Sequence, residues 1–598
     1  MRPVTVALCQ FRPAKGRPTD NLDRIEALFR DLGQSPEPPS VVVFPEGILT
    51  GYFLEGGVRE HARSAPDLFV ALSDRHARSG APPLEVCLGF YELWDERLHN
   101  SVLWAALGGD DAGIRHVHRK VFLPTYGVFD EERFVEAGRD VRAFDTRFGR
   151  AAVLVCEDAW HALVPTIAAV DGAQFIAVVA ASPARGLVPD PVHPGRPGSL
   201  ARWERLAREV AGEHGVFVAL AHLVGFEGGK GFVGGSLLVA PDGEVCAEAP
   251  LFEDASVTHT IDLDEIVRVR AESPLLADLE VKLPHLVESL ERARQRAATG
   301  ERAGGGASFD TPPARPAASD TRRPVVLPRL AIDPALTRRW LVEFLRDEVR
   351  RLRRFERVIV GVSGGVDSAV VAWLAAEALG PERVIGVRMP YRTSSPQSLE
   401  HGRLVTGALG IEERTVDITA AVDGYAAAAG IPVTPERLGN VMARLRMITL
   451  FDLSAALGAL PLGTGNKSER LLGYFTWHAD DTPPVNPIGD LFKTQVWALA
   501  RHLGVPAAIV DKPASADLVA DQTDEGDFGI TYARADGILD LILRSHDAAA
   551  IRAAGFTDQE IATVRRRLDG THWKRRLAST AMLSGTAIGE YYLRPVDY

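Results

Sequence analysis

The chain has 598 residues, of which 46% are apolar and 24% charged, which excludes a collagenous, coiled-coil or wholly disordered protein. Lys and Arg total 67 and Asp and Glu total 79, so the formal net charge is −12 and a chain-wide basic surface for nucleic acid is excluded. The four cysteines are too few for a disulfide framework, which favours a reducing compartment such as the cytoplasm. No apolar run approaches the length of a membrane span.

Residues 1–290 alternate short apolar runs with amphipathic segments. The predicted strands are VTVALCQ, SVVVFPEG, LEVCLGFYE, RAAVLVCEDAW, AQFIAVVAAS and VFVALAHLVGF, and the predicted helices include NLDRIEALFRDLG and LARWERLAREVAGEHG. Strands that are apolar throughout are expected where helices cover a sheet. This part of the chain is therefore predicted to be an α/β domain.

Three polar residues of this domain stand at or near the ends of strand-like runs: Glu46, Lys120 and Cys156. Ligands of α/β sheets gather beyond the carboxyl ends of the strands. A thiol that attacks a carbonyl carbon, a carboxylate that takes its proton, and an amine that stabilises the oxyanion make a complete set for acyl transfer. Each residue alone indicates little, because an isolated Cys is usually buried and an isolated Glu or Lys is usually a surface charge.

The amino-acid sequence around the three residues makes the prediction specific. The segments FPEGILTGY, HRKVFLPTYGVFDEERFVEAG and VLVCEDAW resemble the nitrilase, or carbon–nitrogen hydrolase, superfamily, and in particular the glutaminase domain of glutamine-dependent NAD synthetases. The resemblance implies an α-β-β-α sandwich. It also implies that Glu46 is the general base, Lys120 the oxyanion-stabilising residue and Cys156 the nucleophile, with Tyr126 and Ser182 contacting glutamine. One segment departs from the family: VGFEGGKGFVGGS stands where a Gln-Asp-Glu cluster is usual.

A segment poor in large apolar side chains follows. Residues 291–330 are rich in Ala, Gly, Pro and Arg and bury too little surface to offset the entropy of ordering. They are predicted to be a linker, with an ordered surface excursion as the alternative.

Residues 331–598 again alternate strands and helices, which predicts a doubly wound parallel sheet. The strand RVIVGV runs into SGGVDS and then into a helix, a pattern suited to phosphate because glycines allow close approach of the backbone and the helix N-terminus attracts anions. The loop is not a Walker A loop. The alternative is that the loop is a glycine turn with no role in binding phosphate. The predicted ATP-binding residues of this loop are Gly361, Val362, Ser363, Gly364, Gly365, Val366, Asp367 and Ser368.

SGGVDS resembles the pyrophosphate-binding loop of the ATP pyrophosphatases. The segments MPYRTSSPQS, GNVMARLRM, GTGNKSERLLGYFT, NPIGDLFKTQV, KPASADL and QTDEGDFGITY narrow the resemblance to the NAD synthetase domain. By that resemblance Thr464, Lys493 and Ser515 contact ATP. Asp367 and Glu469 are implied ligands of Mg²⁺, the expected cofactor. The implied contacts of the dinucleotide substrate are Asn440, Arg444, Glu469 and Lys574.

A second departure concerns this substrate. Trp477 and Pro484 stand where the family usually carries a lysine and an aspartate. The loss of a cation and an anion leaves open whether Trp477 stacks on a ring of the substrate or packs in the protein interior.

The two sites together predict an enzyme that hydrolyses glutamine and uses the ammonia to amidate nicotinic acid adenine dinucleotide through an adenylate. Two alternatives remain: an amidotransferase acting on a different carboxylate with ATP, and an amidase with a regulatory nucleotide-binding module. The expected partners are glutamine, ATP and the dinucleotide, with no nucleic acid and no membrane. A homo-oligomer is expected.

Overall fold

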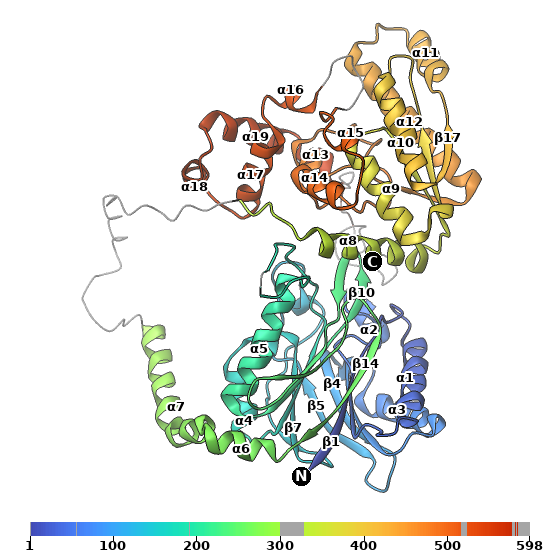
Figure 1. Ribbon diagram of the computed structural model, residues 1–598. Helices are drawn as coiled ribbons and strands as arrows, with labels where there is room; N and C mark the ends of the chain where they lie inside the picture. The colour runs from blue at the N-terminus through green and yellow to red at the C-terminus, as the bar shows by residue number, and fades with distance from the viewer. Residues whose placement is uncertain are drawn as a thin grey trace. The chain divides into compact units, whose positions relative to one another are not determined.

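The computed structural model describes residues 2–54, 57–190, 192–299, 328–515, 523–576, 581 and 583. Residues up to Arg185 and from Gly198 to residue 299 form one compact unit, and residues Gly186–Pro197 with 328–576 form a second. Figure 1 colours the chain by residue number, and the two units are considered separately below.

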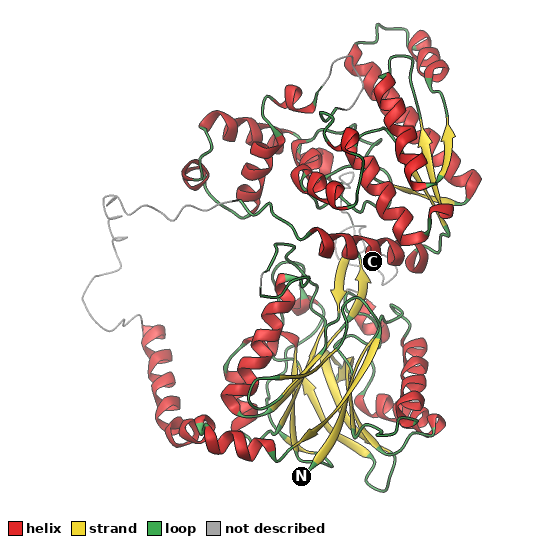
Figure 2. Ribbon diagram, viewed as in Figure 1, coloured by secondary structure: helices red, strands yellow, loops and turns green. Residues whose placement is uncertain are grey.

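In the described part of the first unit, two six-stranded sheets pack face to face (Figure 2). The first sheet has the order β14-β1-β2-β3-β4-β5 and the second the order β13-β12-β9-β8-β7-β6. The strands of the first sheet are β1 (Pro3–Gln10), β2 (Val41–Val43), β3 (Leu84–Trp94), β4 (Arg97–Leu107), β5 (Gly113–Arg119) and β14 (Ala255–Asp262). Those of the second sheet are β6 (Phe144–Asp145), β7 (Arg150–Val155), β8 (Phe175–Ala180), β9 (Phe217–His222), β12 (Leu237–Val239) and β13 (Val245–Glu248).

Helices cover the outer face of each sheet. Helices α1 (Pro18–Gly33) and α3 (Ala65–Ser79) pack on the first sheet, and α4 (Leu163–Val170) and α5 (Gly198–His214) pack on the second. Helix α1 buries Leu22, Ile25 and Phe29, a spacing of three and four residues that places them on one face. The α-β-β-α sandwich predicted from the sequence is confirmed.

Smaller elements complete this unit. They are the helix α2 (Val58–His61), the hairpin of β10 (Val224–Glu227) and β11 (Lys230–Val233), and the helices α6 (Glu265–Glu272) and α7 (Leu275–Thr299), with 3-10 turns at Glu131–Arg133 and Cys156–Trp160. Helix α7 extends nine residues into the predicted linker, 291–299. Alanines and the i,i+4 ion pair of Arg292 with Glu288 favour helix there. Residues 300–327 of that prediction lie outside the described residues.

The second unit contains a four-stranded sheet of order β17-β16-β15-β18 in which every pairing is parallel. Its strands are β15 (Arg357–Gly361), β16 (Val384–Arg388), β17 (Glu412–Thr415) and β18 (Ala459–Leu462). Alternate residues of β15 face opposite sides: Val358 and Val360 lie in the core beneath α8 (Pro334–Leu345), α9 (Val366–Leu379) and α14 (Lys493–His502). Ile359 lies in the core beneath α12 (Pro435–Leu457). The predicted doubly wound parallel sheet is therefore confirmed.

Further helices surround this sheet. They are α10 (Pro396–Leu409), α11 (Thr419–Ala428), α13 (Lys467–Leu472), α15 (Ala507–Val510), α16 (Asp524–Phe528), α17 (Tyr532–Leu543), α18 (Ala548–Ala553) and α19 (Asp558–Gly570), with 3-10 turns at Pro381–Arg383 and His572–Arg575 and a π turn at Arg346–Leu352. Among the described helices of the chain, none combines the length and the hydropathy that a membrane crossing requires.

Candidate active sites

Glu46, Lys120 and Cys156 follow strands β2, β5 and β7, and all three side chains are buried. Lys120 Nζ donates a hydrogen bond to Glu46 Oε1 at 3.0 Å. The charges of Glu46 and Lys120 both act on the Cys156 thiol. The three residues singled out in the sequence therefore lie together in one buried cluster.

A second glutamate, which the sequence argument did not single out, completes this cluster. Glu131 Oε1 accepts hydrogen bonds from Lys120 Nζ at 3.0 Å and from Asn100 Nδ2 at 3.1 Å. It also accepts the Tyr52 hydroxyl at 2.5 Å. The available signal was its place in the segment FDEERF, eleven positions after Lys120, but a Glu in a polar turn normally indicates a solvated charge.

The charges of the cluster are mutually dependent. Burial would lower the pKa of Lys120, but the carboxylates of Glu131 and Glu46 outweigh it and hold that pKa well above its usual value. Burial also raises the pKa of the Cys156 thiol, and Glu46 raises it further, against the opposing effect of Lys120. The thiol is therefore protonated at neutral pH and needs a base, and Glu46 is the adjacent carboxylate.

Glu46 is held in place for this role. Its Oε1 accepts the Asn100 amide at 2.7 Å, and its Oε2 accepts the backbone N–H of Ala181 at 2.7 Å. The turn that carries it lies directly against Gly89 in β3, where an added Cβ would stand 2.7 Å from the Cα of Glu46. Only glycine at position 89 allows the turn to approach the sheet this closely.

Asp158 fixes the position of the nucleophile relative to Lys120. Cys156 has a left-handed backbone, with φ of 47°, at the start of its 3-10 turn. Asp158 Oδ2 accepts the N–H of Val155 at 3.1 Å, and Oδ1 accepts the N–H of Val121 at 3.0 Å. One fully buried carboxylate thus joins the residue before the nucleophile to the residue after Lys120.

We expect Asp158→Asn to destabilise the first unit by about 1–3 kcal/mol, because the amide group cannot accept all of these buried N–H groups. It should also lower the glutamine hydrolysis predicted from the sequence by more than the fraction of unfolded protein explains, since Cys156 and Lys120 lose their common support. Thermal unfolding and glutamate release measure the two effects. The control is Asp145→Asn, whose side chain is 84% exposed and should change neither. An Asp158→Asn variant with wild-type values for both measurements would contradict this role.

The two predicted glutamine contacts lie near the cluster but are not brought to one cavity. The Tyr126 hydroxyl donates to Glu157 Oε2 at 2.8 Å, next to Cys156, and burial together with this bond raises the pKa of Tyr126 to about 12. Ser182 follows Ala181, whose N–H binds Glu46, and lines a small cavity with Trp203 and His222. Both assignments remain predictions.

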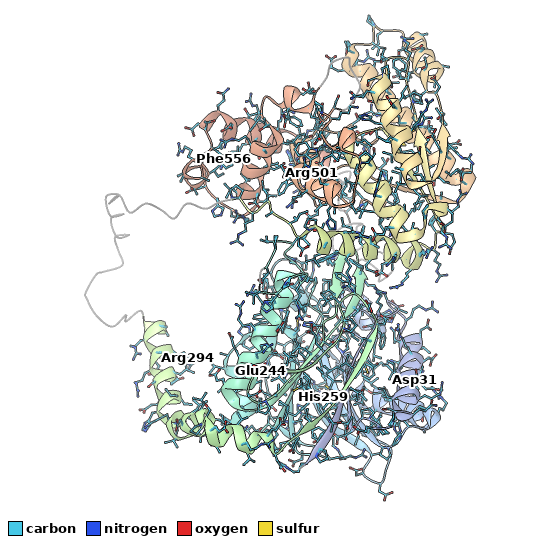
Figure 3. All side chains as sticks on the ribbon, in the orientation of Figure 1. Asp31, Glu244, His259, Arg294, Arg501 and Phe556 are labelled. Atoms are coloured by element: carbon cyan, nitrogen blue, oxygen red, sulfur yellow. The ribbon has the colours of Figure 1, made fainter. Side chains whose placement is uncertain are left out.

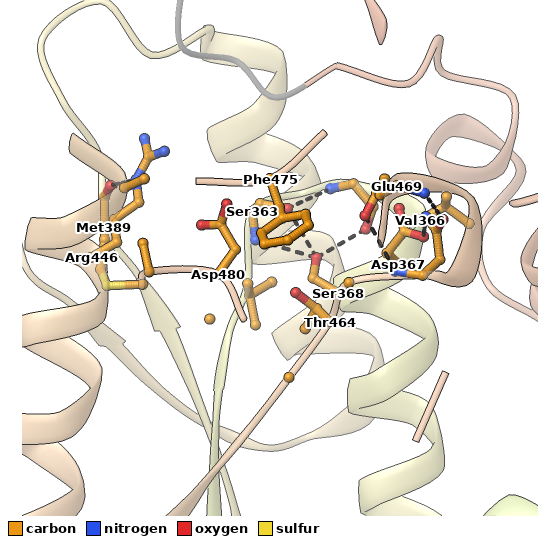
Figure 4. A pocket seen from close by; sticks show the side chains of 18 of the residues that line it. Ser363, Val366, Asp367, Ser368, Met389, Arg446, Thr464, Glu469, Phe475 and Asp480 are labelled. Atoms are coloured by element: carbon orange, nitrogen blue, oxygen red, sulfur yellow. Dashed lines mark hydrogen bonds between the residues drawn. The ribbon is translucent and has the colours of Figure 1, made fainter. Parts of the chain in front are cut away.

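The second site is a cavity of about 350 Å³ at the end of β15 (Figure 4). Every predicted ATP-binding residue of the loop lines it except Gly364, and so do Thr464, Lys493 and Ser515. Gly364 has φ of 78°, and an added Cβ would stand 2.2 Å from the carbonyl oxygen of Ser398, so only glycine fits there. The hydroxyls of Ser363 and Ser368 lie 3.1 Å apart and brace the loop.

Asp367, Lys493 and Glu469 form the charged centre of this cavity. Lys493 Nζ donates to Asp367 and also to Glu469, in the latter case at 3.4 Å, and Asn466 Nδ2 donates to Asp367 Oδ1 at 2.9 Å. Burial and the neighbouring Asp367 raise the pKa of Glu469 to about 8. Burial would lower the pKa of Lys493, but Asp367 and Glu469 outweigh it and raise the pKa.

These carboxylates suit Mg²⁺ shared with a nucleotide. Oxygen is the ligand that Mg²⁺ prefers, and one or two carboxylates plus phosphate oxygens usually complete its shell. Burial, and after it the neighbouring Asp367 charge, raises the pKa of Glu469, and a bound cation would offset both effects. Among the described residues, no group of three or more His, Cys, Asp or Glu side chains is placed to hold a metal.

Three of the predicted dinucleotide contacts do not line the cavity. Arg444 donates to the carbonyl oxygen of Trp477 at 3.2 Å, and Asn440 accepts the Thr476 hydroxyl at 3.1 Å. Lys574 donates to the carbonyl oxygens of residues 473 and 475, both at 2.9 Å. All three hold the segment 473–477, of which Tyr474 and Phe475 line the cavity, while Glu469 lines it directly.

The Trp477 ring packs edge-on against Trp573, with 5.2 Å between ring centroids, and does not line the cavity. Pro484 does not line it either. Arg446, Asp480 and Lys512 do, and sequence reasoning gave none of them a role. Figure 4 shows Arg446 beside Met389, and Asp480 between them and the phosphate loop. The fold brings them together from α12 and two loops, so no local motif marks them.

Comparison with known proteins agrees with both sites. Residues 5–271 match the carbon–nitrogen hydrolase family, and residues 338–578 match the NAD synthase family. The NH(3)-dependent NAD(+) synthetase of Trichlorobacter lovleyi is 46% identical over 265 residues, covering 44% of this chain and 95% of that protein. The glutamine-dependent NAD(+) synthetase of Thermotoga maritima is 31% identical over 100% of this chain and 99% of its own length.

A solved structure shows the same fold over nearly the whole chain. The glutamine-dependent NAD+ synthetase of Acinetobacter baumannii, in complex with ADP, has a TM-score of 0.68 and 22% identity and covers 99% of this chain and 98% of its own. Two family matches in series, one on each active-site cluster, and a relative aligned from end to end lead to one conclusion. The chain belongs to the family of glutamine-dependent NAD+ synthetases.

Proposed function

We propose that this enzyme hydrolyses glutamine in its first unit and uses the ammonia to make NAD⁺ in its second. The single observation that carries the proposal is the presence of two complete polar centres, one around Cys156 and one around Asp367 and Lys493, in one chain. Neither centre would be needed by a non-enzymatic interaction protein.

Glutamine hydrolysis follows from the geometry of the first centre. Glu46 takes the thiol proton of Cys156, the sulfur attacks the amide carbon, and the Lys120 cation stabilises the oxyanion. The C–N bond breaks, Glu46 returns the proton to the leaving nitrogen, and ammonia departs from a thioester. Glu46 then accepts a proton from water, which attacks the thioester and releases glutamate and the Cys156 thiol.

The second centre would bind ATP with its phosphates on the loop of residues 361–368. Bound Mg²⁺, held by Asp367 and Glu469, would neutralise phosphate charge. The Lys493 cation lies beside the same carboxylates and would stabilise charge that develops on the departing pyrophosphate. The substrate carboxylate attacks the α-phosphorus to give an acyl adenylate and pyrophosphate. Ammonia then attacks the acyl carbon, AMP leaves, and the amide of NAD⁺ results.

Transfer of labelled nitrogen tests the whole proposal. Glutamine carrying ¹⁵N in its side-chain amide, with ATP, Mg²⁺ and nicotinic acid adenine dinucleotide, should yield ¹⁵N-labelled NAD⁺, AMP and glutamate in equal amounts. Glutamate formed without AMP would instead support an amidase with a regulatory nucleotide-binding module.

A different acceptor carboxylate is the second candidate, and the observation that favours it is the packing of Trp477 against Trp573. We expect nicotinic acid adenine dinucleotide to bind nevertheless. The affinity for the dinucleotide should fall about tenfold in Arg444→Ala, because the segment 473–477 loses the hydrogen bond from Arg444 to the carbonyl oxygen of Trp477. Trp477→Lys should weaken binding less. Isothermal titration with a non-hydrolysable ATP analogue present measures both, and a wild type that binds no dinucleotide would favour the other acceptor.

The Mg²⁺ requirement should depend on pH. Because burial and Asp367 raise the pKa of Glu469 to about 8, a metal that binds this carboxylate competes with its proton near neutral pH. The Mg²⁺ concentration for half-maximal AMP release should therefore fall as pH rises from 7 to about 8 and level off above. In Glu469→Gln the dependence should vanish. An unchanged pH dependence in that variant would assign it to another group.

We also propose that the enzyme is cytoplasmic, because free cysteines are typical of a reducing compartment.

We propose in addition that the enzyme self-associates. The support for association is α7, where leucines recur at heptad spacing at positions 276, 279, 283, 286 and 290. Leu286 and Leu290 are 49% and 56% exposed, and Figure 3 labels Arg294 near the end of the same helix. Light scattering should give at least a dimer for the wild type and a smaller species for Leu286→Glu/Leu290→Glu. A monomeric wild type would contradict self-association.

A further inference from the structure

The hairpin of β10 and β11 corresponds to the segment VGFEGGKGFVGGS, which lacks the family's usual Gln-Asp-Glu cluster. Its one carboxylate, Glu227, is buried. Glu227 Oε1 accepts the backbone N–H of Tyr52 at 3.0 Å, and Oε2 accepts that of Phe53 at 2.9 Å. Lys15 Nζ lies 3.1 Å from Oε2. The catalytic steps above use none of these residues.

These bonds fix the backbone from which Tyr52 reaches the catalytic cluster. The Tyr52 hydroxyl donates to Glu131 at 2.5 Å, and Glu131 accepts Lys120 Nζ at 3.0 Å. A second tie, from the Tyr91 hydroxyl to the carbonyl oxygen of Tyr52 at 2.6 Å, holds the same peptide from its other side. Glu227 is therefore connected to the Lys120 cation through Tyr52, whose backbone N–H binds Glu227 and whose hydroxyl binds Glu131, the partner of Lys120.

The position of Glu227 has little freedom. A buried carboxylate is costly unless it is hydrogen-bonded and paired with a cation. The two backbone N–H groups and Lys15 therefore determine where the Glu227 carboxylate lies. Gly51, with φ of 81°, admits it closely, because an added Cβ would stand 3.0 Å from Glu227 Oε1. The same hairpin also supports the neighbouring strand end, since the N–H of Ala184 donates to the carbonyl oxygen of Gly231 at 2.8 Å.

We propose that Glu227 is a positioning residue of the glutaminase centre, which sets the place of Lys120 through Tyr52 and Glu131. The proposal rests on the proposed hydrolysis of glutamine at Cys156. The Glu227 carboxylate accepts from the backbone N–H groups of Tyr52 and Phe53, and not from the thiol or from a group on Glu46. Its effect should therefore fall on the rate of the chemical step and not on substrate binding.

The test measures kcat and KM for glutamine hydrolysis in Glu227→Gln, Tyr52→Phe and the double variant. The Gln side chain keeps the shape but places an amide N–H group against a backbone N–H. We expect each single variant to lower kcat about 10- to 100-fold with KM within about twofold of wild type. Both residues act on Lys120 by the same route. The kcat of the double variant should therefore be close to that of the more damaging single variant, and the loss should be well short of the product of the two single losses.

Two comparisons keep the outcome decisive. Glu244→Gln, a change of the same kind at a side chain that is 79% exposed (labelled in Figure 3), should match wild type. AMP release with excess ammonia should be unchanged in every variant, because it uses the other unit. A wild type that does not hydrolyse glutamine would refute the proposed function itself. An active wild type with an unaltered kcat in Glu227→Gln, a loss confined to KM, or losses that multiply in the double variant would each overturn the positioning role.

Discussion

Cys156→Ala should abolish glutamine-dependent NAD⁺ synthesis while leaving ammonia-dependent synthesis intact. The thiol is the only group at the centre of the Glu46–Lys120 cluster that can form the thioester, and loss of a catalytic nucleophile costs at least about 10³-fold in kcat. The second unit has its own core and its own polar centre, so its chemistry does not depend on the thiol. Glutamate release and AMP release, with glutamine or with ammonia as the nitrogen source, measure the two activities separately.

Cys246→Ala is the matched control. Cys246 is a half-buried thiol on β13 of the same unit, and burial raises its pKa to about 11, but no catalytic residue bonds to it. This variant should retain both activities. Glutamine hydrolysis at the wild-type rate in Cys156→Ala would refute the nucleophile assignment.

Asp367→Asn should lose AMP formation with both nitrogen sources. Asp367 binds Lys493 and Asn466 and is an expected ligand of the metal on the phosphates, so its loss removes charge stabilisation worth several kcal/mol, or about 10²-fold or more in rate. Glutamine hydrolysis should persist, because Cys156 and its partners lie in the other unit. The measurement is AMP release at saturating Mg²⁺, with glutamate release followed in parallel.

Asp490→Asn serves as the comparison for this variant. Asp490 pairs with Lys467 at 2.8 Å, but its side chain is 96% exposed, and a surface pair of this kind contributes little. It should leave AMP release unchanged. AMP release by Asp367→Asn comparable to that of wild type would remove Asp367 from the nucleotide site.

The sequence by itself determined both folds and the residues that carry distinctive chemistry. Asp367 lies in a glycine-rich turn between a strand and a helix, so local pattern and residue type mark it. Cys156 and Lys120 follow apolar strands, and their roles were implied by the family resemblance of the segments around them. The alternation of continuous apolar strands with helices predicted an α/β fold for both parts and a parallel sheet for the second, because burial follows the spacing of apolar residues along the chain. The α-β-β-α sandwich of the first part was implied by the family resemblance. The helical character of 291–299 was missed because the composition of the whole segment masked a short run of good helix formers.

Only the tertiary structure decided the supporting residues. Glu131 in a polar turn and Glu227 at the end of a short strand are ordinary glutamates in the sequence. Only folding buries them, the first against Lys120 and the second against the N–H groups of Tyr52 and Phe53. Asp480 and Arg446 likewise reach one cavity from different elements. Trp477 was ambiguous because an aromatic ring can pack on a substrate or on another side chain, and its neighbour Trp573 lies 96 positions away in the sequence. Long-range contacts of common residue types leave no local pattern, because their energy depends on burial and on partners that are distant along the chain.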